Sequence, residues 1–150
     1  MSEPLERRVH VRCRVEHAFH TFTDRIDAWW PPGHRRFERS TLHLEPRVGG
    51  RFVERAATGE EAELGHVLRW EPPHRLTYAW WPGGGTGPTE VDVRFDAEGD
   101  GTRVSIRHAE GESRLGDEWP TRVKKFANAW SVVLPAFARF AATDRQGEDR

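Results

Sequence analysis

The sequence predicts an α+β fold in which a mostly antiparallel β-sheet is covered on one face by a long C-terminal helix. Hydrophobic and polar residues alternate in several short segments between residues 9 and 108, as in strands with one buried face. From Trp119 to Ala141, hydrophobic residues instead recur at spacings of three and four, which indicates an amphipathic helix. The 150 residues suit one domain, with an ordered core over about residues 8–142 and frayed termini.

The first strand and the segment after it are predicted from a change of periodicity. Alternation over residues 9–15 (Val9, Val11, Cys13 and Val15) predicts a strand. Hydrophobic residues then take helical spacing over residues 18–26, until Trp29-Trp30-Pro31-Pro32-Gly33 ends the pattern. We therefore expect one or two short helices after the first strand.

Six further strands follow from the returning two-residue period. They are expected near residues 41–44, 52–56, 62–70, 75–81, 91–95 and 102–108. The turn from Pro46 to Gly50 and the pair Pro72-Pro73 separate strands, because proline cannot donate to a ladder. The glycine-rich segment 82–88 is expected to be a loop. Short connections of this kind make sequential strands antiparallel neighbours, so the sheet has six to seven strands in all.

The predicted C-terminal helix spans about 26 residues, or ~39 Å, which is long enough to cross such a sheet. Asp117 and Glu118 suit its positive N-terminal end, and Pro120 is tolerated in its first turn. Pro135 is different, because it removes the hydrogen bond to the carbonyl of Ser131. We expect a kink there or a break into two helices, and a frayed polar segment over residues 143–150.

Charge and composition exclude several classes of partner. The 23 Lys and Arg against 24 Asp and Glu give a net charge of −1, which disfavours nucleic acid. The single cysteine precludes an internal disulfide, and no apolar run is long enough to span a membrane. Neither does the start MSEPLERR hold the apolar core of a signal peptide. We expect a soluble cytoplasmic protein, either a monomer or a homodimer.

Several motifs taken together resemble a known family. The segment 65–80, GHVLRWEPPHRLTYAW, and the turn 44–52, LEPRVGGRF, resemble signatures of the activator of Hsp90 ATPase homologue 1-like branch of the START-like (SRPBCC, Bet v 1-like) superfamily. Gly101-Thr102-Arg103-Val104 with His108, and Trp130 with Leu134, are also similar. Ala129 departs from the pattern, since the family often has glycine there, and so does Pro135 inside the helix.

This resemblance implies a helix-grip fold: a curved antiparallel sheet wrapped around the long helix, with a cavity between them. Aromatic residues are abundant enough to line it, since the chain has seven Trp and eight Phe. The family leaves the reaction open, because its members include lipid carriers, polyketide cyclases and chaperone activators.

Metal, nucleotide and thiol chemistry have little support in the sequence. His17 and His20 lie one helical turn apart without a third ligand at an informative spacing. Cys13 falls on the buried face of the first strand, where cysteine acts as a small hydrophobic residue. The glycines at 83–87 lack the Lys-Ser/Thr ending of a phosphate-binding loop. We expect no metal and no cofactor.

Strand alternation places three polar side chains on the inner face: Glu54, Tyr78 and His108. Buried polar groups need partners, so either an internal network such as Glu54 with His108 or a bound ligand must satisfy them. Of the adjacent Trp29 and Trp30, one is expected to pack inward and the other to lean toward solvent or a partner. The expected ligand-binding residues are Trp30, Phe52, Glu54, Tyr78, Trp80, His108, Phe126 and Trp130.

These residues favour a domain that binds a small apolar or aromatic molecule in an internal cavity. One alternative is a cyclase or hydrolase that uses Glu54, His108 or Tyr78 as acid or base in the same cavity. Another is a protein-interaction role, including chaperone activation. No catalytic residue is assigned from the sequence, which leaves enzymatic activity open and favours binding alone.

Overall fold

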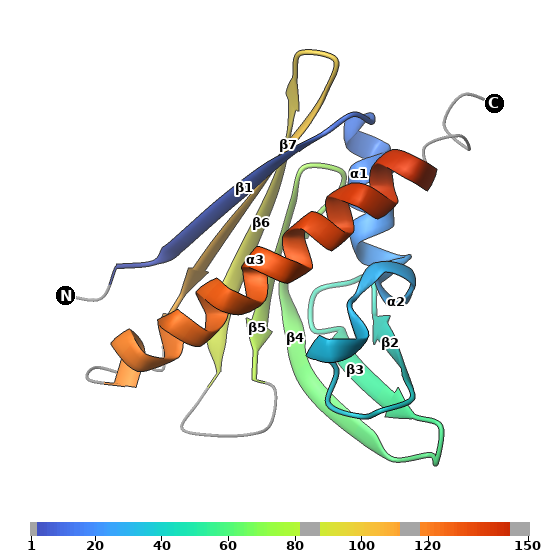
Figure 1. Ribbon diagram of the computed structural model, residues 1–150, viewed down its shortest axis with the longest axis vertical. Helices are drawn as coiled ribbons and strands as arrows, with labels where there is room; N and C mark the ends of the chain where they lie inside the picture. Colours follow the sequence, from blue (N-terminus) through green and yellow to red (C-terminus); the bar gives the residue numbers. More distant parts are fainter. Residues whose placement is uncertain (1–2, 82–87, 112–117, 145–150) are drawn as a thin grey trace.

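The computed structural model describes residues 3–81, 88–111 and 118–144, and in it a seven-stranded antiparallel sheet carries helices on one face (Figure 1). The strands are β1 (Leu5–Val11), β2 (Ser40–Leu44), β3 (Arg51–Ala56), β4 (Glu61–Glu71), β5 (Arg75–Trp80), β6 (Thr89–Glu98) and β7 (Gly101–Ala109). The helices are α1 (Val15–Thr23), α2 (Ile26–Trp29), the 3₁₀ turn η1 (Pro32–His34) and α3 (Trp119–Asp144).

The order of strands across the sheet is β1-β7-β6-β5-β4-β3-β2. Strands β2 to β6 each pair with the next strand along the chain. Only β1 joins out of sequence, against β7, after α1 and α2 have crossed the sheet between β1 and β2. The predicted α+β helix-grip architecture is therefore confirmed.

The sheet curls because the pairing shifts register twice, at Phe52/Val53 between β3 and β4 and at Val67/Arg69 between β4 and β5. Gly65 lies between the two shifts. A Cβ atom on this residue would overlap the carbonyl of Ala79, so only glycine lets β4 approach β5 this closely. The bend brings β3 and β2 around toward the helices.

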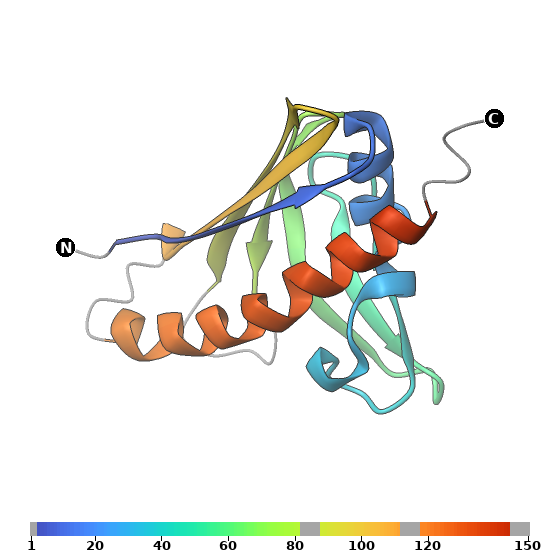
Figure 2. The same ribbon diagram turned by 45° about the horizontal axis from the view of Figure 1, so that its top comes forward.

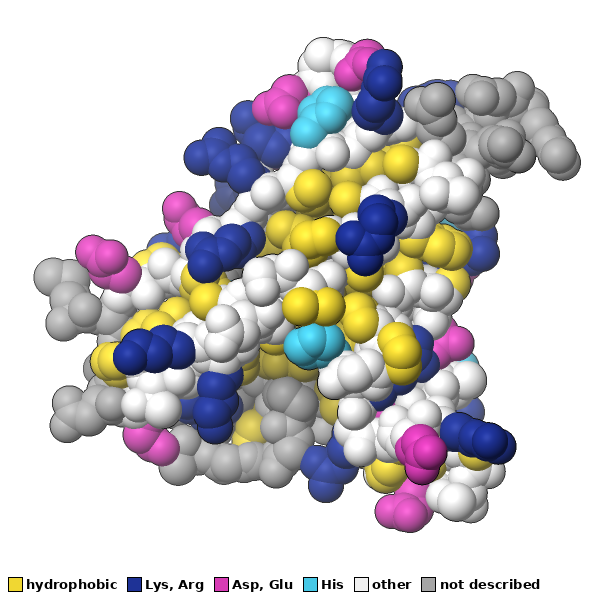
Figure 3. All heavy atoms as spheres, viewed as in Figure 1, with side chains coloured by type: hydrophobic (Ala, Val, Ile, Leu, Met, Phe, Trp, Pro, Cys, Tyr) yellow, Lys and Arg dark blue, Asp and Glu magenta, His cyan; other side chains and the backbone are white. Residues whose placement is uncertain are grey.

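Helix α3 runs obliquely across the concave face of the sheet, and α1 and α2 lie beside its C-terminal half (Figures 1 and 2). One continuous hydrophobic core lies between them. At its centre the Phe22 ring contacts Phe95 of β6 and Phe137 of α3, with centroids 5.8 and 5.2 Å apart. Hydrophobic side chains gather along the line of α3 in the space-filling view (Figure 3).

The first strand differs from its predicted range. Strand β1 begins earlier, at Leu5, and ends at Val11, while Val15 already begins α1. The chain bends at residues 12–13, where the Cys13 amide donates to the Val11 carbonyl at 2.9 Å. Cys13 is buried as expected. Its side chain therefore points inward, although the residue lies beyond the end of β1. Strand β5 likewise ends one residue before its predicted limit.

Helix α3 is continuous through Pro135, so the expectation of a break into two helices is wrong. The carbonyl that proline leaves without its helical donor belongs to Ser131, which is exposed. Water can therefore take the place of the missing donor. Helix α3 ends at Asp144, whereas residues 145–150, Asp117 and the loop at 82–87 lie outside the described residues. None of the helices described has the length and apolar character needed to cross a bilayer.

Candidate functional site

Seven of the eight predicted site residues come together on the inner face as one aromatic cluster. It consists of Trp30, Phe52, Tyr78, Trp80, His108, Phe126 and Trp130, which come from five parts of the fold: the end of α2, β3, β5, β7 and α3. Ring centroids lie 5.4 Å apart for Phe52 and Trp80, and 6.5 Å apart for Trp30 and Trp130. Edge-on and tilted contacts of this kind each add about 0.5 to 1.5 kcal/mol beyond the area they bury.

Both Trp29 and Trp30 are buried, with 5% and 6% of their surface exposed, so the expectation that one leans toward solvent is wrong. The backbone becomes extended at Trp30, immediately after α2, and this separates the directions of the two side chains. The Trp29 ring packs on Phe22 and Phe137, whereas Trp30 turns toward Phe52 and the aromatic cluster. The helices and the curled sheet therefore shield both tryptophan side chains from solvent.

His108 lies at the centre of a hydrogen-bonded chain that joins α3 to the sheet. The indole N–H of Trp130 donates to Nδ1 of His108 at 3.1 Å. Nδ1 must then be unprotonated, because an indole nitrogen is a donor only. Nε2 therefore carries the proton and donates to Oγ1 of Thr89 at 2.7 Å, and Thr89 donates to the carbonyl of Trp80 at 3.2 Å. Both ring nitrogens of His108 are in use.

Burial, with the positive charge of Arg122 nearby, lowers the pKa of His108 to about 3. The imidazole also stacks on Phe126 at 4.1 Å, and the Arg122 guanidinium lies over the Phe126 ring, 5.7 Å from its centroid. Both ring nitrogens are bonded within the protein, so His108 holds Trp130 of α3 against the sheet.

Glu54 does not pair with His108, contrary to one predicted network. Its carboxylate accepts from the amides of Arg36 and Phe37 at 3.0 and 2.9 Å, and from the Ser40 hydroxyl at 2.8 Å. Glu54 is almost completely buried, so these charge-assisted bonds offset the cost of removing a carboxylate from water. Glu54 holds the segment between η1 and β2 against the sheet.

Tyr78 is the exception among the three inward polar residues. Its side chain is fully buried, and its hydroxyl has no hydrogen-bond partner among residues 3–81, 88–111 and 118–144. Burial raises the pKa of Tyr78 above its usual range, so the phenol stays protonated and can donate. The rings of Phe52 and Trp80 lie 5.5 and 6.0 Å from the Tyr78 ring.

Two features of this region were not predicted from the sequence. Thr89 continues the inward alternation of Val91 and Val93, so the periodicity held a signal for it. Arg35 had no such signal, because its partners come from chain folding: it binds the Asp27 carboxylate at 2.7 Å and the carbonyls of Trp30 and Ser40. This largely buried arginine ties α2 to β2 and so fixes Trp30 within the aromatic cluster.

Within the described part of the chain, no group of three His, Cys, Asp or Glu side chains is placed to hold a metal ion. His17 lies 3.2 Å from the Ala141 carbonyl, and His20 lies 3.5 Å from the Asp24 carboxylate, so the two histidines serve separate contacts.

Comparison with known proteins places this geometry in a family. The sequence model of the activator of Hsp90 ATPase homolog 1-like proteins matches residues 12–141. No curated protein matches the chain significantly. Among solved structures, an anthrahydroquino-γ-pyrone synthase, Txn09, is 32% identical, with a TM-score of 0.60 over 91% of this chain and 96% of that one.

Two further structures are similar. CalU16 from Micromonospora echinospora is 25% identical, with a TM-score of 0.65 over 97% of this chain and 78% of that one. MLL2253 from Mesorhizobium loti has a TM-score of 0.72 over 96% of this chain and 98% of that one, but is 16% identical and shows the fold alone. The family match and the similarity to the synthase support a ligand-binding domain in general. With 130 residues matched and the helix-grip fold present, the chain belongs to the activator of Hsp90 ATPase homolog 1-like family.

Proposed function

We propose that this chain binds a small aromatic molecule between the sheet and α3, with the Tyr78 hydroxyl as the polar contact that orients it. The hydroxyl of Tyr78, which has no hydrogen-bond partner in the described part of the chain, carries this proposal. A buried hydroxyl without a partner costs about 1 to 3 kcal/mol, so it is seldom kept in a core without a role. A ligand oxygen that accepts from Tyr78 removes that cost.

The surroundings of Tyr78 suit a planar ligand. Phe52 and Trp80 flank its ring, and Trp30 lies 5.8 Å from Trp80. Aromatic walls with few polar groups are typical of small-molecule sites. Glu54 and His108, by contrast, form their hydrogen bonds within the protein, and these bonds hold the aromatic side chains around the site in place.

Similarity to the synthase supports the choice of ligand class. The name of that protein denotes fused aromatic rings that carry oxygen atoms, which match aromatic walls and one hydrogen-bond donor. We therefore expect a ligand with three or so fused rings and a carbonyl or hydroxyl oxygen that reaches Tyr78.

The test compares two probes that share a ring framework: anthraquinone, which has carbonyl oxygens, and anthracene, which has none. Both should bind saturably and quench tryptophan emission. Tyr78→Phe should weaken anthraquinone binding about tenfold, equivalent to about 1.4 kcal/mol, and leave anthracene binding unchanged. The same variant should unfold at an equal or higher denaturant concentration, since it removes an unpaired buried hydroxyl.

Ser105→Ala is the matched control, because it removes a hydroxyl from the opposite face of the sheet. Equal loss of affinity in the two variants, or no saturable binding of either probe by folded protein, would contradict the proposal. Mass spectrometry of molecules that copurify with the native protein then identifies the physiological ligand.

A second candidate is a ring-forming enzyme, favoured by the 32% identity to a synthase. A γ-pyrone ring forms when a hydroxyl oxygen adds to a ketone carbon of a 1,3-diketone and water then leaves. The protonated Tyr78 phenol would donate to that ketone oxygen as negative charge develops on it. Neither His108 nor Glu54 has this freedom.

A hydroxyanthraquinone with a 1,3-diketone side chain is the substrate to assay, with ring closure followed by absorbance. Catalysis predicts that Tyr78→Phe lowers turnover about 10²-fold while substrate still binds. If the substrate binds but its ring closes at the uncatalysed rate, the enzyme proposal is wrong and ligand binding is the function that remains.

A further inference from the structure

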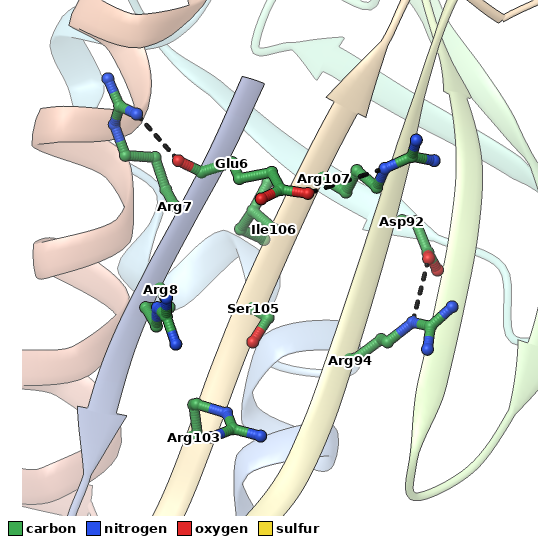
Figure 4. A pocket seen from close by; sticks show the side chains of 9 residues that line it. All are labelled: Glu6, Arg7, Arg8, Asp92, Arg94, Arg103, Ser105, Ile106 and Arg107. Atoms are coloured by element: carbon green, nitrogen blue, oxygen red, sulfur yellow. Dashed lines mark hydrogen bonds and ion pairs between the residues drawn. The ribbon is translucent and has the colours of Figure 1, made fainter. Parts of the chain in front are cut away.

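The outer face of the sheet, opposite α3, holds a hollow of about 660 Å³ over β1, β7 and β6 (Figure 4). Five arginines and two carboxylates line it, with Ser105 and Ile106 between them. None of these residues belongs to the aromatic cluster. The hollow is therefore separate from the proposed ligand site, on the other side of the same strands.

The strand register explains why the hollow exists. Ser105 of β7 pairs with Arg8 on β1 and with Arg94 on β6, so one small side chain lies between two long ones. Figure 4 shows the Ser105 side chain between Arg8 and Arg94. Two residues away on either side along β7, Arg103 and Arg107 face the same way, about 13 Å apart at the strand rise.

Positive charge in the hollow is only partly neutralised. Arg8 has no hydrogen-bond or ion-pair partner among the residues that the structure describes. Arg107 lies 3.8 Å from Glu6, with both side chains more than half exposed. Arg94 contacts Asp92 at 3.2 Å, but Asp92 already accepts two bonds from Arg75 and one from Thr77.

The pKa of Asp92 is consistent with an excess of positive charge around it. Burial raises its pKa, but hydrogen bonds from Arg75, Thr77 and Arg94 outweigh this and hold the pKa below the usual range. Its single negative charge is therefore present at neutral pH and is shared among several donors. Arg103 is also paired, with Glu98 at 3.0 Å and Asp96 at 4.0 Å, so Arg8 and Arg94 are the guanidinium groups best placed to take a planar carboxylate or phosphate partner.

We propose that this hollow, named here the arginine hollow, binds an acidic segment of a partner protein, with carboxylates over Ser105 bridging Arg8 and Arg94. Charge complementarity supports this occupant. In an extended segment, alternate side chains on one face lie about 6.6 Å apart, so carboxylates at every second or fourth residue match the spacing along β7.

The charge of the whole chain favours an acidic protein over nucleic acid. The net charge is −1, so the rest of the surface repels a long polyanion even where the hollow attracts it. A short acidic segment needs only the hollow itself. Its association should be electrostatically steered and should weaken steeply with salt.

The test is fluorescence anisotropy of a labelled peptide of alternating glutamate and glycine, at low ionic strength. Saturable binding is expected, and the glutamine analogue should not bind. Combined Arg8→Gln and Arg94→Gln should weaken binding about tenfold or more. Ser105→Glu should do the same, because it places a carboxylate of the chain between the two arginines.

Arg55→Gln is the matched control, since Arg55 lies on the outer face of β3, outside the hollow, and pairs with Glu61 at 3.0 Å. Its binding should stay within about twofold of wild type. An equal loss in Arg55→Gln would overturn the proposal by showing general charge attraction. Tighter binding of a short DNA duplex, or displacement of the peptide by inorganic phosphate at constant ionic strength, would overturn the choice of partner.

Discussion

At the scale of single residues, three buried polar side chains on the inner face differ in how they are hydrogen-bonded. Glu54 binds backbone amides of the segment between η1 and β2, and His108 links Trp130 to Thr89. Tyr78 has neither kind of partner among the described residues. We therefore assign a structural role to Glu54 and His108 and a ligand contact to Tyr78. A group with unused hydrogen-bonding capacity can recognise a ligand without breaking an internal bond.

His108 should make stability fall as the pH is lowered. Its folded pKa of about 3 lies below the value of 6.5 expected when unfolded. Below that unfolded value, the unfolded chain binds a proton that the folded chain does not, so stability is complete above about pH 6.5 and decreases toward about pH 3. Between pH 7 and pH 4.5 we expect a loss of about 2 to 3 kcal/mol, measured by urea unfolding.

His108→Gln is the comparison, because glutamine does not titrate in this range. The variant should be less stable at pH 7 but should lose much less stability on acidification. The NMR signals of the His108 ring in the wild-type protein should not titrate between pH 7.5 and 5. A His108 resonance with a midpoint near 6.5 would show that the buried, neutral imidazole is misassigned.

At the scale of elements, α3 tolerates a proline because of where its free carbonyl lies. Pro135 is half-buried, whereas Ser131, one turn earlier, faces solvent. The segment from α2 to β2 is held differently, by charged groups: Arg35 with Asp27, and Glu54 with the amides after η1. Helix α3 therefore stays continuous because the carbonyl that Pro135 leaves free faces solvent. The segment that carries Trp30 is instead held in place by hydrogen bonds to charged side chains.

Pro135→Ala should stabilise the protein. Alanine restores the amide that bonds to Ser131, and interior proline costs a helix about 3 kcal/mol. Part of this gain is lost because proline also restricts the unfolded chain, by about 0.4 to 1 kcal/mol. We expect a net increase of about 2 to 2.6 kcal/mol in the free energy of unfolding, measured by chemical denaturation. A decrease would mean that packing of the proline ring against the core contributes more stability than the proline costs the helix.

At the scale of the whole molecule, the two faces of one sheet have different chemistry. The concave face and the helices share a continuous hydrophobic core that includes the aromatic cluster. On the opposite face, the arginine hollow is exposed to solvent. Small-molecule binding and partner binding can therefore take place on the same domain without competing for side chains.

This single core predicts cooperative unfolding of the chain as one domain. Tryptophans occur in α2, β4, β5 and α3, so their emission reports on most of the fold. Tryptophan fluorescence and far-ultraviolet circular dichroism should give urea transitions with coincident midpoints. Two separated midpoints would show that α3 or the β2–β3 hairpin unfolds independently.

The sequence by itself determined the layers of the fold and the face on which most site residues lie. Two-residue and helical periods are local properties, so they identified the strands, α3 and the inward direction of Phe52, Tyr78 and His108. Periodicity could not locate the ends of elements, which depend on pairing and bends. For this reason Val15 was assigned to a strand, although it begins α1.

Only the tertiary structure decided which inward groups become partners. Glu54 and His108 share a face but bind different segments, because the curl of the sheet turns β3 toward the loop after η1. Similarly, the arginine hollow requires the register that sets Ser105 between Arg8 and Arg94. Contacts between residues far apart in the chain depend on register, curvature and helix placement, and these are properties of the packed molecule that no local period encodes.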